Sequence, residues 1–333
     1  MAKQRAITWQ STKEDLNVCR HKNGNIDYDK YRRSKLEAVE RHTGIPLVTY
    51  ATDFLSADKV RACQGQVDID LTDLQGFQEV TRDLPEGPLD VLLHSPGGSA
   101  EAGESIVKVI RQRFSPVRFI VPVTAKSAAT MLALSGDEIL MPPSAELGPI
   151  DPQFRLSDGA GGIIMTPAQV LIDQFRQAQA EIAGNQALAA AWAPILQRYG
   201  VGLYQKSLNA IDLSKLLVKQ YMTAYMLKGR ADADQVSSRV VDFLADHNAF
   251  KSHARRVDLA ELQARDVVAK DIRTVDPVLW QRVEEAWYAI EHTFEGTGVF
   301  KLFENSHGRG FFRMVQVMVQ VAGQPRPIAP KDA

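Results

Sequence analysis

Two short segments of this chain contain the residue types that acyl transfer uses. The first, residues 94–98 (His-Ser-Pro-Gly-Gly), ends an apolar run, and its glycines present backbone N–H groups with no side chain in the way. The second begins about thirty residues later, where Ser127 precedes the apolar stretch 128–134. The amides and the dipole at the start of a helix favour developing negative charge. Together the segments predict an oxyanion hole and a serine nucleophile.

Each segment also has an ordinary structural interpretation. A glycine pair after a strand is common in a plain strand-to-helix turn. A serine at a helix start most often caps the helix by accepting a backbone N–H. The small residues at 128, 129 and 133 suit close packing alone. Taken singly, the segments leave both interpretations open.

A third segment favours the catalytic interpretation. Residues 147–153 read Leu-Gly-Pro-Ile-Asp-Pro-Gln, and they follow residues 95–98 (Ser-Pro-Gly-Gly) and 125–131 (Ala-Lys-Ser-Ala-Ala-Thr-Met). In this order and spacing the three resemble the SppA and ClpP class of serine peptidases, and more closely the serine dehydrogenase proteinases. The resemblance covers about residues 46–275. It implies an α/β fold, a ClpP/crotonase-like spiral of ββα units with a helical C-terminal region, and a serine endopeptidase that forms an acyl-enzyme.

The resemblance also implies roles for single residues. It makes Ser127 the nucleophile and places the backbone N–H groups of Gly98 and Ala128 in the oxyanion hole, with Gly97 shaping the loop. Residues 147–153 would flank the cleft. A peptide substrate would lie as an extra strand beside the glycine loop, because main-chain pairing tolerates varied side chains.

The general base is missing from the positions where the related enzymes keep it. A serine hydroxyl is a poor nucleophile until a base accepts its proton. No histidine lies between His94 and His247, and no lysine lies between Lys126 and Lys206. Lys126 itself is discounted, since the side chains of adjacent residues diverge.

Two other residues are candidates for the base. His253 lies in a basic loop near the place where ClpP-like enzymes bring in their catalytic acid, and it is equally compatible with a surface histidine. Lys219 lies in an apolar helical stretch that could desolvate it, although such lysines more often extend their charge to water. His253 is slightly favoured. Asp151 could orient either base or simply form a turn between two prolines, and His94 is expected on the wrong side of the serine.

Composition narrows the classes of partner. Lys and Arg total 39 against 40 for Asp and Glu among 333 residues, so no overall field would recruit nucleic acid or an anionic membrane. The two cysteines, Cys19 and Cys63, favour a reducing compartment, and we expect the cytoplasm. No stretch approaches the roughly 18 apolar residues of a membrane helix. No metal-ligand spacing or nucleotide-binding glycine loop is present, so neither a metal nor a cofactor is expected.

The pattern along the chain predicts three parts: an N-terminal arm or helix (1–45), the peptidase domain (46–275) and a C-terminal extension (276–333). Strand-like runs alternate with the helical stretches 102–114 and 127–134, which favours parallel pairing. The predicted strands of the domain are 47–50, 67–71, 89–94, 117–123 and 138–141. Residues 166–250 are mostly helical in pattern and suit a subdomain or an oligomer arm, and 314–319 alternates as a strand does.

Two further functions are compatible with the same segments. A catalytically silent scaffold of this fold would bind peptides or proteins, which the missing base favours. A crotonase-like acyl-CoA enzyme would use the same oxyanion geometry on a thioester without a serine nucleophile. The leading expectation is a peptidase that acts on peptides or unfolded proteins and assembles as a homo-oligomer.

Overall fold

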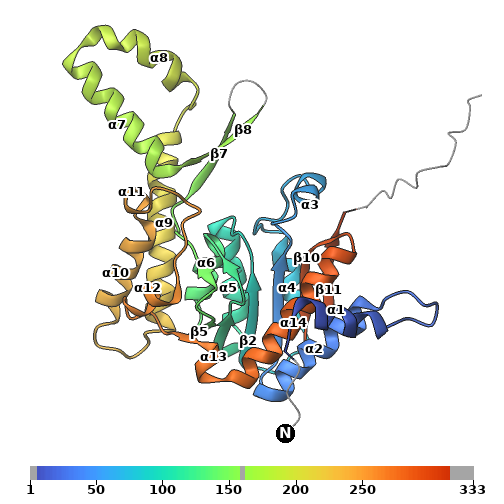
Figure 1. The fold of residues 1–333 in the computed structure, drawn as a ribbon. Coiled ribbons are helices and arrows are strands. Elements are labelled where there is room, and N and C mark those ends of the chain that lie inside the picture. The colour runs from blue at the N-terminus through green and yellow to red at the C-terminus, as the bar shows by residue number, and fades with distance from the viewer. Residues whose placement is uncertain (1–5, 158–161, 316–333) are drawn as a thin grey trace, which may run out of the picture.

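The computed structural model describes residues 6–157 and 162–315. Its centre is a seven-stranded sheet in the order β11-β10-β1-β2-β3-β5-β9 (Figure 1). Five neighbouring strands pair in parallel: β1 (Leu47–Thr52), β2 (Gly87–His94), β3 (Phe114–Ile120), β5 (Glu138–Met141) and β9 (Ala269–Asp271). At one edge β10 (Val299–Asn305) and β11 (Gly310–Met314) run antiparallel. The α/β class and the parallel pairing predicted from the sequence are confirmed.

Both faces of the sheet are buried, as in most parallel sheets. Val91 and Leu93 of β2 face one core, while Leu92 between them faces the other. The helices that contribute to the first core include α4 (Asp73–Thr81), α5 (Ala100–Arg111), α6 (Ala128–Leu134) and α9 (Leu203–Ala224). The second core is closed by α2 (Tyr28–Thr43), α13 (Ile272–Val275) and α14 (Pro277–Gly296).

Local sequence signals explain where the helix next to the glycine loop begins. The Ser99 side chain accepts a hydrogen bond from the Ala102 amide at 3.1 Å, and Glu101 lies in the first turn, where the helix dipole favours an acid. Ile106 and Ile110 then recur on one face and are buried. The chain therefore leaves the glycine loop directly into a well-capped α5.

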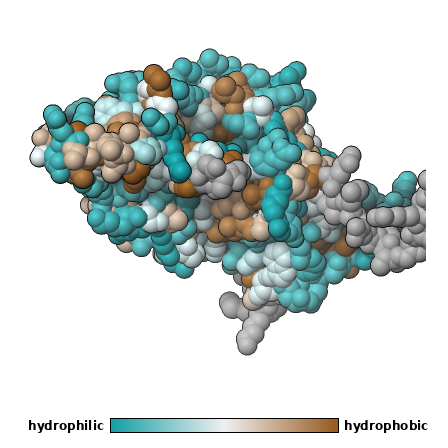
Figure 2. Space-filling model, turned by 90° about the horizontal axis from the view of Figure 1, so that it is seen from above, coloured by the Kyte–Doolittle hydropathy of each residue, from teal (hydrophilic) through white to brown (hydrophobic). Residues whose placement is uncertain are grey.

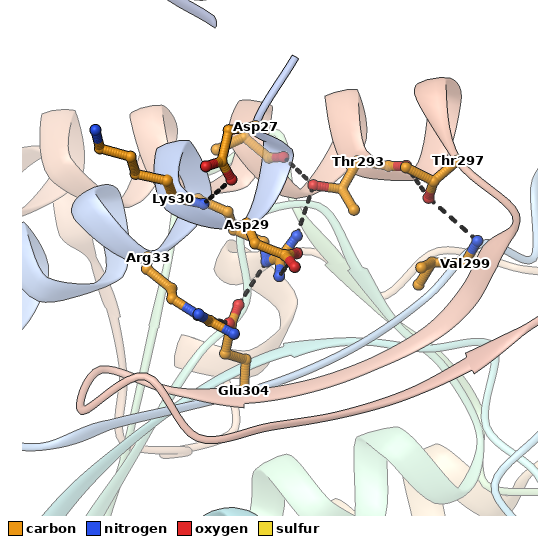
Figure 3. Close-up of polar contacts among 10 residues, drawn as sticks. Asp27, Asp29, Lys30, Arg33, Thr293, Thr297, Val299 and Glu304 are labelled. Atoms are coloured by element: carbon orange, nitrogen blue, oxygen red, sulfur yellow. Dashed lines mark hydrogen bonds and ion pairs between the residues drawn. The ribbon is translucent and has the colours of Figure 1, made fainter. Parts of the chain in front are cut away.

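The terminal segments belong to the same sheet and core as the middle of the chain. Strand β10 pairs with β1, and α14 packs beside α2 and α1 (Trp9–Val18). Figure 3 shows Arg33 of α2 beside Glu304 of β10, with which it forms an ion pair. The buried Arg32 also forms an ion pair with Glu304, at 2.5 Å. Residues 276–314, which the sequence sets apart as an extension, thus contribute two strands to the sheet and a helix to its second core. Their pattern did not reveal this because their partner strand lies about 250 residues earlier.

An arm projects from the body of the molecule (Figure 1). It consists of the hairpin β7 (Gln153–Ser157) and β8 (Ile163–Pro167) with the helices α7 (Ala168–Gly184) and α8 (Ala189–Gln197), the last two joined through a short 3-10 turn, η1 (Gln186–Leu188). The chain returns through α9 to α10 (Ala233–Ala245), α11 (His247–Phe250) and α12 (Leu259–Gln263). The predicted helical region is confirmed. None of the helices in the two described stretches is long and apolar enough to span a bilayer.

Two predicted strands need correction. Residues 67–71 form no strand; they lie mostly in turns and a bend, and only Ile69 forms a bridge, with Gly98. The segment therefore serves the glycine loop instead of the main sheet. The predicted strand 314–319 overlaps β11 only at Met314, and its residues 316–319 lie outside the described residues. Helix α5 also ends at Arg111, before Phe114 begins β3.

Candidate active site

A small second ladder brings four distant segments together. Strands β4 (Thr124–Ala125) and β6 (Glu146–Leu147) pair in parallel. Ser95 forms a bridge with Ala125 on one side, and Val257 forms an antiparallel bridge with Leu147 on the other. The glycine loop follows Ser95, and Ser127 follows β4. The same ladder thus fixes both predicted motifs and the C-terminal loop that contains His253.

Ser127 adopts an unusual backbone conformation. It stands immediately before α6 with φ 50° and ψ −122°, a region that non-glycine residues rarely occupy. Its side chain makes no capping hydrogen bond to the helix, so the ordinary N-cap interpretation does not hold. The side chain is partly exposed, whereas Ala128 and the rest of α6 are buried. The hydroxyl is therefore left free at the start of a rigid helix.

The two glycines of the loop are required by close approach as well as by backbone angle. Gly97 has φ 96°, and a Cβ there would come within 2.5 Å of the Lys126 carbonyl and the Ser127 Cβ. Gly98 has φ 150°, and a Cβ there would lie 2.3 Å from the Ile69 carbonyl oxygen. Both contacts are shorter than any side chain could tolerate. The loop passes directly against Ser127 because these positions have no side chains.

Two amides beside Ser127 have no hydrogen-bond acceptor among the described residues. The Gly97 carbonyl accepts from the Ile69 amide at 2.6 Å, which turns the Gly98 amide away from that segment. At the start of α6 the first amide paired within the chain is that of Ala129, which donates to the Lys126 carbonyl at 2.8 Å. The N–H groups of Gly98 and Ala128 are the pair predicted from the sequence. Their freedom is what an oxyanion hole requires.

A buried charge holds the loop segment from behind. The Lys301 side chain of β10 is fully buried, and its Nζ donates to the Asp68 carbonyl at 2.6 Å and to both oxygens of Asp73 at 2.8 Å. Tyr50 donates its hydroxyl to Asp73 at 2.8 Å. Since Asp68 precedes Ile69, this ion pair fixes the strand-like stretch on which Gly98 rests.

A carboxylate between two histidines stands on the other side of the site. Asp151 is 2 % exposed, and its Oδ1 lies 2.6 Å from His253 Nδ1 while its Oδ2 lies 2.9 Å from His247 Nδ1. The Ile150 amide donates to the Leu244 carbonyl at the end of α10, which brings residue 151 to the loop that contains both histidines. The Nδ1 contact leaves His253 Nε2 as the nitrogen available for proton transfer.

Cavity lining distinguishes the two histidines. His253 and Ser127 line the same cavity of about 400 Å³, together with Gly97 and Gly98. His247 lines a neighbouring cavity of about 680 Å³, which His253 also lines and Ser127 does not. No hydrogen bond joins the Ser127 hydroxyl to His253 in the described part of the chain. Without substrate such contacts are commonly long and shorten in the bound complex.

The other candidate bases lie elsewhere. Lys219 forms a 2.8 Å ion pair with Asp234, its side chain is 39 % exposed, and it lines none of the cavities that Ser127 lines. The structure thus does not bring Lys219 to the serine, because it lies on the outer side of α9 against α10. Lys126 pairs with Glu146 at 2.8 Å. His94 is buried between Phe54 and Trp287, and burial lowers its pKa to about 3.

Sequence reasoning missed three residues at the site. His247 shares the Asp151 carboxylate, and its only sequence signal was its place at the start of the histidine-containing loop. Asp68 and Arg155 form a 3.6 Å ion pair on the wall of the Ser127 cavity. Burial raises the pKa of Asp68, although Arg155 and Lys301 oppose the rise. Among the residues that the structure describes, no group of three or more His, Cys, Asp or Glu side chains is arranged to hold a metal ion.

Part of the chain is similar to known proteins. Residues 68–190 match the model of a family described as ClpP-like SDH-type serine proteinases. The resemblance and the fold class predicted from the sequence are confirmed. The matched range contains Ser127, the glycine loop and Asp151 but excludes both histidines and Lys301.

Two uncharacterized proteins of Methanocaldococcus jannaschii are similar to parts of the chain. One is 32% identical over 124 residues, which are 37% of this chain and 40% of that protein. The other is 36% identical over 87 residues, which are 26% of this chain and 30% of that protein. The chain thus matches less than half of the length of either relative.

Solved structures were also found to be similar. A mutant of the 1510-N membrane-bound stomatin-specific protease is 20% identical with a TM-score of 0.37, over 62% of this chain and 78% of its own. ClpP1 from Listeria monocytogenes is 12% identical with a TM-score of 0.38, over 73% and 97% of the two chains.

Proposed function

We propose that this protein, whose residues 68–190 match the model of the ClpP-like SDH-type serine proteinases, is a serine endopeptidase that acts through an acyl-enzyme on Ser127. One observation carries the proposal. A strained serine with a free hydroxyl, the amide of Gly98 and a histidine backed by a buried carboxylate surround one cavity. The amide of Ala128 follows this serine directly, and neither amide has an acceptor among the described residues. The two free cysteines suit a reducing compartment, and we place the protein in the cytoplasm.

The proposed reaction begins when a peptide carbonyl lies between Ser127 and the glycine loop. Ser127 Oγ attacks the carbonyl carbon while His253 Nε2 takes the hydroxyl proton, and Asp151 stabilises the imidazolium through Nδ1. The amides of Gly98 and Ala128 donate to the oxyanion. His253 then gives the proton to the leaving amine. Water, activated by the same histidine, releases the acyl group and restores the hydroxyl.

The surroundings of Ser127 suit a peptide substrate. A cavity of about 210 Å³ adjoins Ser127 and Ala128, and Met131, Ile150 and Leu213 are among the apolar residues that line it. An extended peptide can place one side chain there while its backbone follows the glycine loop. The cavities on the other side of Ser127 leave the path open toward His253.

A fluorophosphonate probe tests the nucleophile directly. We expect the wild-type protein to be labelled on residue 127 and the Ser127→Ala variant to give only background labelling, because the phosphonate mimics the tetrahedral intermediate at the activated hydroxyl. Ser144→Ala is the matched control, since this exposed serine lies outside the cavities around Ser127. Its labelling should equal that of the wild type.

Two outcomes would contradict the proposal. An unlabelled wild type that still binds peptides would indicate the catalytically silent scaffold. An unlabelled wild type that binds an acyl-CoA would indicate the crotonase-like alternative. Mass spectrometry of the labelled peptide distinguishes residue 127 from any other serine.

The arm is the surface through which we propose that the protein forms homo-oligomers. Helix α8 has no buried residue although its sequence is largely apolar, and Ile163, Ile164 and Ile195 are exposed. Seen from above, brown and tan side chains gather on the projecting arm (Figure 2). Exposed apolar patches of this kind mark association surfaces. A second copy of the chain would cover this one.

Sedimentation at micromolar concentration checks the proposed assembly. We expect the wild-type protein to sediment as an oligomer and the double variant Ile164→Asp with Ile195→Asp to shift toward the monomer, because two charges would be buried at the interface. Val18→Asp, on an exposed residue of α1, should leave the assembly unchanged. A wild type that is monomeric at this concentration would contradict the proposal.

A further inference from the structure

A second cavity lies at the C-terminal ends of β1 and β2, on the face of the sheet that α14 covers. Its volume is about 380 Å³, and Thr52 and His94 end the two strands that reach it. Trp9, Trp287 and Phe294 supply aromatic walls. None of its lining residues lines the cavities that contain Ser127. The proposed peptidase reaction leaves this cavity without a role.

Two buried polar atoms of this cavity have no partner in the described stretches: Thr52 Oγ1 and His94 Nδ1. Thr52 is fully buried and His94 is 3 % exposed. A buried polar atom without a hydrogen bond costs about 1–3 kcal/mol. Both residues line the cavity, and a bound donor could satisfy these two atoms where a shift of the wall side chains exposes them.

His94 Nδ1 must be an acceptor. Burial lowers the pKa of this imidazole to about 3, so the ring is neutral at ordinary pH and has one acceptor nitrogen. The hydrogen bond with the Thr124 backbone raises the pKa of His94. A hydrogen bond raises the pKa of an imidazole when the ring N–H donates it, so the ring is the donor in this contact. Since Nδ1 is the unpaired atom, the donor is the other nitrogen. Nδ1 is left to accept.

The cavity has no free cation among the described residues and one carboxylate without a partner. The Lys59 ammonium is already used: it lies 2.9 Å from Asp53 Oδ2, donates to the Val299 carbonyl at 2.7 Å and donates to the Phe294 carbonyl as well. Glu291 has no hydrogen bond or ion pair among the residues described. Burial and repulsion from Asp53 raise the pKa of Glu291 to about 7. The cavity therefore offers unpaired acceptors and no free cation, which disfavours an anion.

We propose that this cavity binds a primary alkylammonium group. The three N–H donors of such a group match the three unpaired acceptors: the Glu291 carboxylate, His94 Nδ1 and Thr52 Oγ1. The alkyl stem would pack against Trp9 and Trp287, whose ring faces also attract a cation. Approach of the cation would favour the ionised form of Glu291, whose partly buried carboxylate has no counter-charge bound to it among the described residues.

The position of the cavity suggests two sources for the ammonium group. Leu55 lines it and also lines the larger cavity beside His253, so the two cavities meet at this exposed side chain. A lysine side chain of a peptide in the cleft could reach across Leu55. A free alkylamine could enter instead from solvent. Both sources present a primary ammonium group on an alkyl stem.

Titration with n-butylammonium chloride tests the proposal on the full-length protein. Calorimetry and tryptophan fluorescence report binding, since Trp9 and Trp287 line the cavity. We expect saturable binding that is about tenfold or more tighter than that of 1-butanol, because one charge-assisted hydrogen bond is worth at least that factor. Butyrate should not bind. Equal binding of butylammonium and 1-butanol would overturn the proposal.

Two variants on α14 separate the site from general charge effects. Glu291→Gln should weaken butylammonium binding about tenfold or more, because the amide supplies no negative charge. Glu285→Gln removes a carboxylate from the same helix, one that pairs with Lys35 instead, and should leave binding unchanged. Matching melting temperatures show that both variants fold. An unchanged affinity in Glu291→Gln, or an equal loss in both, would contradict the assignment.

A pair of acetylated peptides then distinguishes the two sources. One contains a lysine and the other has norleucine at that position. If butylammonium displaces only the lysine peptide from the Ser127→Ala protein, the site holds a substrate side chain. If both peptides bind equally and are unaffected by saturating butylammonium, the site serves a free amine. These binding measurements need no turnover, so they remain valid if the proposed peptidase activity fails its own test.

Discussion

Replacing His253 with alanine is expected to lower kcat for a peptide substrate roughly a million-fold, as removal of the base of a serine nucleophile does. His253 is the histidine that lines the cavity with Ser127, and its Nδ1 lies 2.6 Å from the buried Asp151. Without it the hydroxyl proton has no acceptor. Steady-state hydrolysis of a fluorogenic peptide measures the loss.

His247→Ala is the matched control for this variant. His247 binds the same carboxylate but lines only the neighbouring cavity. Its removal should lower kcat about tenfold or less, the effect of one lost hydrogen bond on the orientation of Asp151. If kcat falls more in His247→Ala than in His253→Ala, His247 is the base and His253 is not. Full activity in both variants would require another base and would sink the proposed reaction.

Lys301→Met is expected to reduce the free energy of unfolding by about 3–5 kcal/mol, because it leaves the buried Asp73 without its counter-charge. Both side chains of this ion pair are fully buried. The variant also removes the hydrogen bond to the Asp68 carbonyl, so the glycine loop loses its support. Urea unfolding measures the change in stability. The loss of kcat should exceed any rise of KM in the fraction that remains folded.

The free energy of unfolding that Lys301→Met loses should decrease as the pH falls. Burial already raises the pKa of Asp73 while Lys301 opposes the rise, so the variant carboxyl takes up a proton more readily. A protonated Asp73 needs no counter-charge. The difference between wild type and variant should therefore be largest above the raised pKa and shrink as the pH falls through it.

Two further variants show whether the buried charge is the cause. Lys215→Met breaks an exposed ion pair with Asp242 and should change stability by less than about 1 kcal/mol. Adding Asp73→Asn to Lys301→Met should restore part of the lost stability, because no bare charge then remains. If the double variant loses as much free energy of unfolding as the two single variants added together, Lys301 and Asp73 do not stabilise each other.

Periodicity and local motifs predicted those parts of the fold in which neighbours in sequence are neighbours in space. The strands around residues 89–94 and 138–141 and the helix after Ser127 follow from apolar runs and turn residues. The segment 67–71 has the same apolar alternation, yet its partner is the glycine loop and not the main sheet. Strand composition does not specify which partner a strand meets. For the same reason β10 could not be placed beside β1.

The proposed nucleophile and the glycine loop could be located from the sequence because glycines and a small-residue helix are local signals. The sequence narrowed the proposed base to two candidates and slightly favoured His253, but it could not decide, since Asp151 and His253 lie 102 residues apart and are brought together by contacts such as the bridge between Leu147 and Val257. Apolar neighbours made Lys219 a plausible base. Its position within α9 instead turns it to the outer side, where Asp234 pairs with it.

Lys301 has a consequence for the order in which the chain is made. Ribosomes synthesise proteins from the N-terminus, so Ser127, Asp151 and His253 all emerge before β10 does. A nascent chain that has reached only α14 contains these three residues but lacks the cation behind Asp68 and Asp73. The proposed oxyanion loop would gain its support only after β10 has been made. The proposed peptidase would thereby be prevented from cutting its own unfinished copies and other growing chains nearby.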